Sequence, residues 1–278
     1  MPKKAASLDV EVRNNIAIAW LDRPKTYNAL DEGMVQDLLA FLEEVSAEQS
    51  LRALIIGGRG EAFCAGMDVD WMRRMGQQGG RANDQSALAI ARLYYALHTC
   101  PIPTVARVHG HCFAGGVGLA AACDIAMAST DVEFGCTEAK RGLVPAGIAP
   151  YVMRAMGRRN AQRYLLSGER FDASEAYRLG LVQEICPPDE LDARINMLLG
   201  HLVAGAPNAL RVTKQLLQTL RGAAIDEALV KQSAQRLAQM RTTDEAQEGM
   251  SAFLEKRDPA WIATKSAKPA AKKRAQKR

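Results

Sequence analysis

Apolar and polar positions alternate on either side of a pair of asparagines near the start of the chain. Val10 and Val12 precede Asn14-Asn15, and Ile16, Ile18 and Trp20 follow it. Alternation across a two-residue asparagine turn predicts a β-hairpin. The spacing then changes, and from Met34 to Val45 the apolar residues recur at helical intervals behind Asp31, a good N-cap. An amphipathic helix is therefore predicted after the hairpin.

Short apolar runs next to glycines or prolines follow the first helix. The runs "LRALIIGG" (51–58), "CPIPTVARVHG" (100–110) and "DIAMAS" (124–129) predict buried strands, with a polar loop over 76–85 and a helix over 86–98 between the first two. Strands that alternate with helices indicate an α/β fold with right-handed crossovers. After Pro150 the pattern becomes helical, with good helices over 170–180, 191–220 and 226–257. We expect an α/β core over 8–200, a helical region over 201–262 and a tail over 263–278.

The positive charge is concentrated in that tail. Of 36 Lys and Arg residues, seven lie in the last fourteen positions, and the remaining 29 are fewer than the 31 acidic residues. A Lys/Ala/Pro-rich tail is expected to be a solvated, disordered extension, with polyanion contact as the alternative. Six cysteines without a C-x-x-C pair are typical of a reducing compartment. With neither a signal peptide nor an apolar run long enough to span a membrane, we expect a cytoplasmic protein that does not contact membranes.

The stretch "GHCFAGGVGLAAACDIAMAS" (110–129) begins a predicted buried helix with two glycines. It matches neither the dinucleotide fingerprint nor the P-loop pattern. Glycines at a helix start let a ligand oxygen approach the free N–H groups of the first turn, although they could also serve close helix packing. A second stretch, "FCAGMD" (63–68), also follows a strand and exposes backbone. Two such N–H groups from separate strand ends predict an oxyanion hole.

Six motifs occur in the order and spacing of one family. They are "LDRPKTYNAL", "AFCAGMDVDWM", "GHCFAGGVGLAAACDIAMA", "FGCTEAKRGLVP", "SGERFDASEAYRLGLV" and "EGMSAFLEKRDP". Over residues 8–261 the chain resembles the enoyl-CoA hydratase/isomerase (crotonase) superfamily, and "AGMDVDWM" and "GLVPAGIAPYVM" look most like bacterial methylglutaconyl-CoA hydratases. The resemblance implies a crotonase (ClpP-like) spiral of ββα units. It also implies that the C-terminal helices build a homotrimer or a hexamer made of two trimers.

The resemblance also assigns the catalytic residues. Family members hold the acyl-CoA thioester oxygen between two backbone amides, which here fall on Met67 and Gly115, and the glutamate of their "FG-x-x-E" motif corresponds to Glu138. One preorganised donor to a developing oxyanion is worth roughly 3–4 kcal/mol of transition-state stabilisation. Glu138 is expected to move a proton at the carbon next to the thioester.

One position departs from the two-glutamate hydratases. Their second glutamate, which orients water, corresponds to Gly118 in this chain. Hydration then depends on Glu138 or on a carboxylate of the substrate to orient water, and a glutamate placed at position 118 is expected to supply the missing group. A double-bond shift needs only one carboxylate to carry the proton, so hydratase and isomerase both remain open.

By the same resemblance, the substrate's coenzyme A is held mainly by backbone and a few side chains. Candidate residues are Lys25, Asn28, Ala29, Ala65, Gly66, Met67, Asp68, Val69, His111, Gly115, Gly116, Phe253 and Lys256. Coenzyme A is part of the substrate, so no separate cofactor and no metal site are expected. The sequence therefore predicts hydration of a branched or carboxylated 2-enoyl-CoA, with isomerisation as the alternative. A non-catalytic RNA-binding homologue is the alternative from another class.

Overall fold

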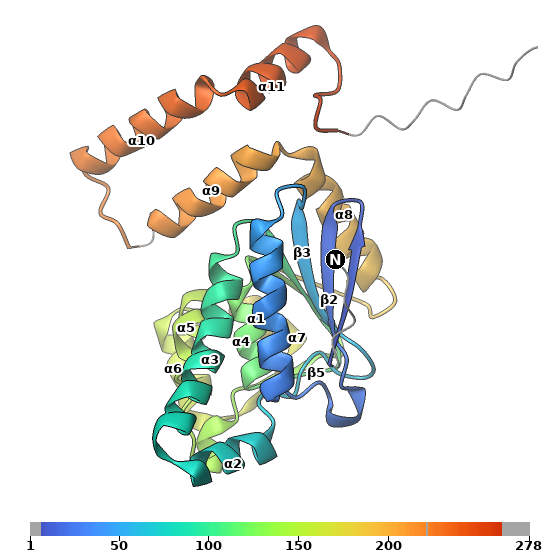
Figure 1. The fold of residues 1–278 in the computed structure, drawn as a ribbon, viewed down its shortest axis with the longest axis vertical. Coiled ribbons are helices and arrows are strands. Elements are labelled where there is room, and N and C mark those ends of the chain that lie inside the picture. The colour runs from blue at the N-terminus through green and yellow to red at the C-terminus, as the bar shows by residue number, and fades with distance from the viewer. Residues whose placement is uncertain (1–6, 221, 263–278) are drawn as a thin grey trace, which may run out of the picture. The chain divides into compact units, whose positions relative to one another are not determined.

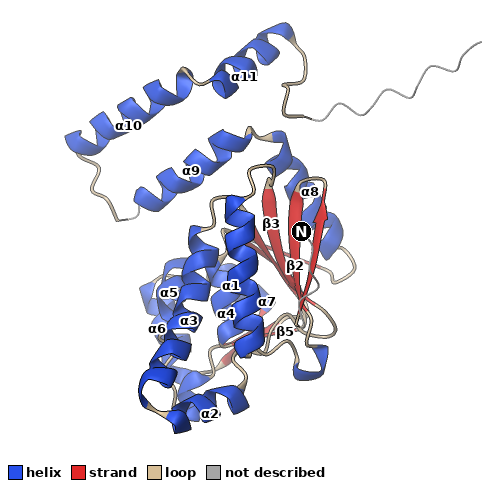
Figure 2. Ribbon diagram, in the orientation of Figure 1, coloured by secondary structure: helices blue, strands red, loops and turns tan. Residues whose placement is uncertain are grey.

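The computed structural model describes residues 7–220 and 222–262, and the chain divides into two compact units, residues 1–202 and 203–278. The predicted basic tail, 263–278, lies outside the described residues. Figures 1 and 2 show the elements. The strands are β1 (Leu8–Arg13), β2 (Ile16–Leu21), β3 (Ala53–Gly58), β4 (Thr104–Val108), β5 (His111–Phe113), β6 (Ile125–Ser129), β7 (Glu133–Gly135), β8 (Arg170–Asp172) and β9 (Glu184–Cys186). The helices of the first unit are η1 (Pro24–Thr26), α1 (Glu32–Ala47), α2 (Val69–Gln78), α3 (Gly80–Thr99), α4 (Gly115–Ala122), η2 (Glu138–Arg141), α5 (Ala149–Met156), α6 (Arg158–Ser167), α7 (Ala173–Arg178) and α8 (Leu191–Ala204).

The predicted hairpin and first helix are confirmed. Asn14 and Asn15 both have positive φ, 49° and 64°, which is the backbone that a two-residue type I′ turn requires. The α1 helix begins behind Asp31, whose carboxylate accepts a hydrogen bond from the Met34 N–H at 2.9 Å. Local sequence therefore determines both elements.

A six-stranded sheet with the order β1-β2-β3-β4-β6-β9 forms the centre of the first unit. Its β1 and β2 are antiparallel and every other neighbouring pair is parallel. Strand β3 is buried on both faces: Leu54 and Ile56 belong to the main core, and Ala53 and Ile55 pack in a smaller core with Leu191 of α8. Burial on both faces explains why this strand is continuously apolar.

A second sheet has three strands, in the order β5-β7-β8. Strand β5 is parallel to β7, and β8 is antiparallel to it. Residues 170–172, which were predicted as the start of a helix, form β8 because Phe171 pairs with Phe134 of β7 and stacks on its ring at 5.6 Å. Tertiary pairing overrides local helical spacing here.

The predicted polar loop over 76–85 is also wrong, because α2 and α3 continue through it and meet at Gly79. Gly79 has φ 59°, a backbone that favours glycine and lets two helices meet at an angle. The residues are polar because they are largely exposed on the two helices. Within the described residues, no helix combines the length and apolarity needed to cross a membrane.

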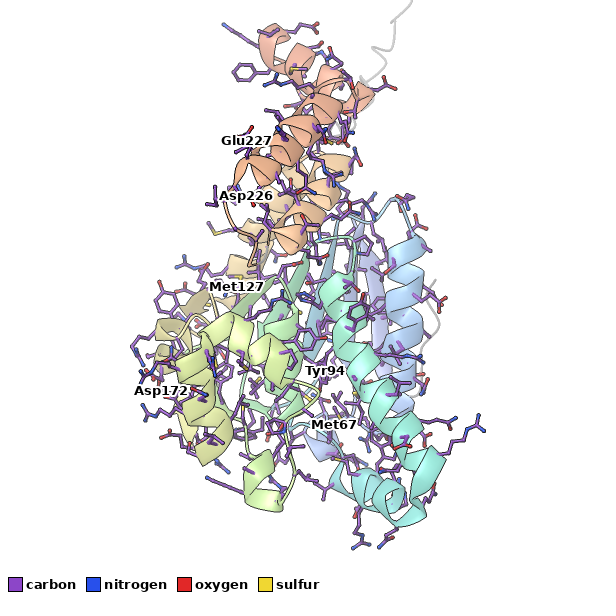
Figure 3. The ribbon with its side chains drawn as sticks, turned by 90° about the vertical axis from the view of Figure 1, so that its left-hand side faces the viewer. Met67, Tyr94, Met127, Asp172, Asp226 and Glu227 are labelled. Atoms are coloured by element: carbon purple, nitrogen blue, oxygen red, sulfur yellow. The ribbon has the colours of Figure 1, made fainter. Side chains whose placement is uncertain are left out.

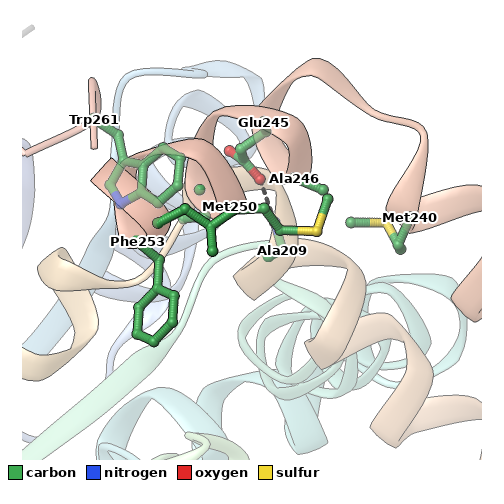
Figure 4. Close-up of a pocket in the computed structure, with 10 residues that line it drawn as sticks. Ala209, Met240, Glu245, Ala246, Met250, Phe253 and Trp261 are labelled. Carbon is green, nitrogen blue, oxygen red and sulfur yellow. Dashed lines mark hydrogen bonds between the residues drawn. The ribbon is translucent and has the colours of Figure 1, made fainter. Parts of the chain in front are cut away.

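The second unit contains α9 (Pro207–Thr219), α10 (Glu227–Arg241) and α11 (Asp244–Glu255). The helix predicted over 191–220 ends before Pro207, and the one predicted over 226–257 breaks where Thr243 caps α11. Figure 4 shows an apolar groove between these helices, where Glu245 accepts a hydrogen bond from the Ala209 N–H at 2.9 Å. Met250, Phe253 and Trp261 are among its lining residues.

Candidate active site

One cavity of about 560 Å³ in the first unit brings together the three predicted catalytic residues, Met67, Gly115 and Glu138. The predicted binding residues Ala65 and Val69 also line it. Its other lining residues lie on α2 and α3, directly before α4, and in the segment 137–148: Met72, Asn83, Ala87, Ile90, Ala91, Tyr94, Ala114, Thr137, Arg141, Leu143, Val144, Pro145, Ala146, Gly147 and Ile148. Apart from Glu138 and Arg141, these residues are uncharged, as suits a pocket for an acyl chain.

Backbone pairing places residues 64–68 beside the start of α4. The Cys64 N–H donates to the His111 carbonyl at 3.1 Å, and the Phe113 N–H donates back to the Cys64 carbonyl at 2.9 Å. On the other side, the Leu30 N–H donates to the Gly66 carbonyl at 2.8 Å and the Asp68 N–H to the Leu30 carbonyl at 2.9 Å. Residues 64–68 are therefore held between two neighbouring segments.

This pairing leaves two backbone donors for a ligand. The bridge to Leu30 uses the groups of Gly66 and Asp68, and within the described part of the chain no hydrogen bond uses the N–H of Met67. Gly115 is the first residue of α4, where an N–H has no partner inside the helix. The helix dipole adds partial positive charge at the same place. Two N–H groups on the wall of one cavity can stabilise a negative oxygen.

Close packing explains the glycines at this site. A Cβ on Gly115 would lie 2.8 Å from the Tyr94 hydroxyl oxygen and 3.0 Å from the Met67 methyl, and a Cβ on Gly116 would lie 2.4 Å from the Cys64 carbonyl oxygen. Buried Tyr94 donates a hydrogen bond to the Gly115 carbonyl at 3.2 Å. Figure 3 shows Met67 and Tyr94 in the same part of the first unit. Both interpretations of the glycine pair, ligand access to free N–H groups and close helix packing, therefore apply: Gly115 lines the cavity, and Gly116 allows close packing.

Glu138 begins η2, and its carboxylate has the properties of a proton carrier. Burial raises its pKa, while its own backbone N–H and the charge of Arg141 lower it less strongly. Its Oε2 is buried and has no hydrogen-bond partner among the described residues. A raised pKa and an unpartnered oxygen on the cavity wall suit an acid/base group.

Ile148 and Tyr94 fill the space beside Gly118. A Cβ at this position would lie 2.2 Å from Ile148 Cγ2 and 2.9 Å from Tyr94 Cε1. A glutamate at 118 could therefore supply a second carboxylate only if the side chains of Ile148 and Tyr94 moved away. Within the described residues, Glu138 is the only carboxylate that lines the cavity.

Asp68, which was predicted to contact coenzyme A, helps to hold residues 64–68 in place. Its carboxylate accepts the Trp71 N–H at 3.0 Å and pairs with Arg23 at 3.3 Å, and Arg23 also pairs with Asp31 at 3.2 Å. Burial raises the pKa of Asp68, but the Trp71 N–H and the Arg23 guanidinium outweigh it and hold the pKa below its ordinary value. Arg23 thus ties the residue after Met67 to the start of α1.

The remaining predicted binding residues of the first unit differ in their exposure. Lys25 is exposed on η1. Asn28 is fully buried: its side-chain amide donates to the carbonyls of Arg59 and Ala62, and its backbone N–H donates to the Arg23 carbonyl at 3.0 Å. The predicted contact of Asn28 with coenzyme A therefore needs correction, because the residue has no exposed surface. The Ala29 carbonyl accepts a hydrogen bond from Arg23.

His111 faces a second cavity of about 350 Å³ that shares Ala65, Thr137 and Arg141 with the first. Its ring stacks on Phe113 with centroids 5.4 Å apart. The last two predicted binding residues belong to the second unit: Phe253 is 82% exposed on α11, and Lys256 caps that helix.

Sequence reasoning missed Arg23, Arg141 and Ile148. Arg141 could have been found, because it follows Glu138 by one turn of a short helix, whereas the contact of Ile148 with Gly118 joins distant positions. Among the described residues, no group of three or more His, Cys, Asp or Glu side chains could hold a metal ion.

Comparison with known proteins identifies the family. The model of the family "Enoyl-CoA hydratase/isomerase" matches residues 11–264. The chain belongs to the enoyl-CoA hydratase/isomerase family. Members of this family act on acyl-CoA thioesters, so the predicted family, crotonase fold and hydratase activity are confirmed. The cavity with two free N–H groups and a buried carboxylate is therefore the candidate active site of an enoyl-CoA hydratase.

Relatives of this family member cover nearly its whole length. An enoyl-CoA hydratase of Shewanella pealeana has a crystal structure with a TM-score of 0.89 and 36% identity, over 93% of this chain and 97% of that one. The short-chain-enoyl-CoA hydratase of Clostridium acetobutylicum is 29% identical over 89% of this chain and 94% of its own length. The 2,3-dehydroadipyl-CoA hydratase of Escherichia coli K12 is also 29% identical, over 91% of this chain and 98% of its own length. Relatives named for different acyl groups have the same overall sequence identity to this chain, so identity alone does not determine which acyl group it accepts.

Proposed function

We propose that this enoyl-CoA hydratase adds water to a branched or carboxylated 2-enoyl-CoA, such as a methylglutaconyl-like thioester, with Glu138 as its single acid/base. The observation that supports the proposal is the composition of the cavity wall. Glu138 lies there with Arg141, and the side chain of Ile148 occupies the space beside Gly118, where other hydratases carry a second glutamate. One carboxylate must then serve both proton transfers.

The proposed reaction steps follow from the residues that line the cavity. Water attacks C3 and gives a proton to the Glu138 carboxylate, while the C2–C3 π electrons move toward the thioester oxygen. The N–H groups of Met67 and Gly115 stabilise the enolate that results, and Glu138 returns the proton to C2. Burial suits this cycle, because a raised pKa makes the Glu138 carboxylate a stronger base toward the proton of the attacking water.

Two observations support a carboxylated acyl group. Arg141 supplies a cation on the cavity wall, and one relative is named for 2,3-dehydroadipyl-CoA, whose acyl chain ends in a carboxylate. A substrate carboxylate can also help to orient the water that a second glutamate would otherwise hold.

The test is a panel of crotonyl-CoA, pent-2-enoyl-CoA and glutaconyl-CoA, assayed for both 3-hydroxyacyl-CoA and shifted double bonds. We expect glutaconyl-CoA to be hydrated with the highest kcat/KM. A double-bond shift without hydration would favour the isomerase, in which Glu138 carries a proton between C2 and C4. Equal hydration of all three thioesters would contradict the carboxylated substrate.

Gly118→Glu should fail to raise crotonyl-CoA hydration. Overpacking against Ile148 and Tyr94 should instead lower the free energy of unfolding by about 1–3 kcal/mol or more. Gly118→Ala is the matched control, because it adds the clash without the charge. A rise in hydration with an unchanged thermal melt would show that the space beside Gly118 opens for the carboxylate.

We also propose a homotrimer, or a hexamer of two trimers, and a cytoplasmic location. The support for assembly is the apolar surface of α11, where Phe253 and Leu254 are 82% and 79% exposed. Light scattering should give three or six chain masses, and Phe253→Glu should lower that number. Coenzyme A is proposed to contact Lys25, Ala29 and residues 65–69 of the first unit. In the second unit, Phe253 of α11 and Lys256, which caps that helix, are proposed separately as coenzyme A contacts.

A further inference from the structure

Arg141 and Arg170 are the Arg or Lys residues that line the two cavities, and Arg141 differs from Arg170 because it has no carboxylate partner among the described residues. Its guanidinium donates only to Thr137 in its own turn, to Oγ1 at 2.6 Å and to the carbonyl at 3.3 Å, and it forms no ion pair within residues 7–220 and 222–262. Arg170, which lines the second cavity, pairs with Glu133 at 2.8 Å. Arg141 thus keeps most of its donors for a ligand.

The short helix η2 places Arg141 on the same side as Glu138. Side chains three residues apart in a 3₁₀ helix eclipse one another, about 6 Å apart along the axis. Both side chains line the cavity, and Arg141 is close enough to lower the pKa of Glu138. A group beside Arg141 is therefore only a few bonds from the carbons that Glu138 serves.

We propose that Arg141 is the specificity residue for this site and binds a carboxylate carried by the acyl group one or two carbons beyond C3. This inference rests on the proposed function and names the side chain that recognises the substrate. The planar guanidinium offers paired donors that match a carboxylate. The other anions of an acyl-CoA, its phosphates, are separated from the thioester by the pantetheine arm, whereas Arg141 lies beside the reacting group.

The test compares two saturated thioesters that differ only at the end of the acyl chain: glutaryl-CoA, which ends in a carboxylate, and pentanoyl-CoA, which ends in a methyl group. Binding to the wild type, Arg141→Gln, Arg141→Lys and Lys140→Gln is measured by calorimetry. Arg141→Gln should weaken glutaryl-CoA binding about 10–100-fold, the size of a hydrogen-bonded charge pair, and leave pentanoyl-CoA binding unchanged. Arg141→Lys should fall between these values.

Lys140→Gln is the matched control, because it removes the same charge from the same helix at an exposed position that does not line the cavity. It should leave the binding of both thioesters unchanged. Equal weakening of both thioesters by Arg141→Gln would assign Arg141 to the phosphates of coenzyme A and overturn the proposal, as would unchanged glutaryl-CoA binding.

Saturated thioesters undergo no hydration, so this result is independent of the reaction. A wild type that binds glutaryl-CoA through Arg141 but hydrates no enoyl-CoA of the panel would contradict the proposed function alone. If hydration is observed, Arg141→Gln should raise KM for glutaconyl-CoA and leave KM for pent-2-enoyl-CoA unchanged.

Discussion

Glu138→Gln should lower the hydration rate of an enoyl-CoA by at least about 100-fold, the lower end of what general acid/base catalysis contributes. The amide keeps the size of the side chain and removes its ability to accept a proton. Exchange of the α-proton of a saturated acyl-CoA in D₂O should fall with it. Exchange at the wild-type rate would refute the role of Glu138.

Stability and pH dependence separate this effect from damage to the fold. Burial raises the pKa of Glu138, so its ionised form is disfavoured in the folded state, and the stability cost appears as pH rises through the folded pKa. Glu138→Gln should therefore melt no lower than the wild type at pH 7. In the wild type, kcat/KM should rise with pH along a limb above the ordinary Glu value of 4.5. The variant should lack that limb.

Met67→Pro should lower kcat about 10²–10³-fold, because it deletes one of the two N–H groups that we propose stabilise the thioester oxygen. Met67 is chosen in place of Gly115 because a Cβ at Gly115 would lie 2.8 Å from the Tyr94 hydroxyl oxygen. The preceding residue is Gly66, with φ 101°, and a glycine accepts the restriction that proline places on its neighbour.

Met67→Leu is the control, since it changes the side chain and keeps the N–H, and its turnover should stay near that of the wild type. Binding of an alkyl-CoA thioether, which has no carbonyl oxygen, should be the same in the wild type and both variants. That binding reports an intact pocket. Unchanged turnover in Met67→Pro would sink the assignment of this amide to the oxyanion hole.

Local chemistry made part of the fold predictable. The hairpin at Asn14-Asn15 and the Asp31 cap depend on neighbours within a few positions, so the sequence alone is enough to place them. Predictions failed where distant strands or helix angles decided the outcome. Residues 170–172 become a strand because β7 is available to pair with them, and the polar stretch at 76–85 stays helical because α2 and α3 meet at Gly79.

The same division holds for the candidate site. Two glycine-containing turns after strands predicted an oxyanion hole, because backbone donors can be inferred from residue type and order, and the family resemblance then assigned Met67, Gly115 and Glu138. Only the tertiary structure brought them to one cavity, through pairing of residues 64–68 with Leu30 and Cys112. It also decided that Ile148 occupies the space beside Gly118 and that Arg141 shares a wall with Glu138. Both outcomes depend on how side chains from different elements fill space and in which direction they point. The sequence gives the residue types and their order, but these packing contacts form only when the elements come together in the fold.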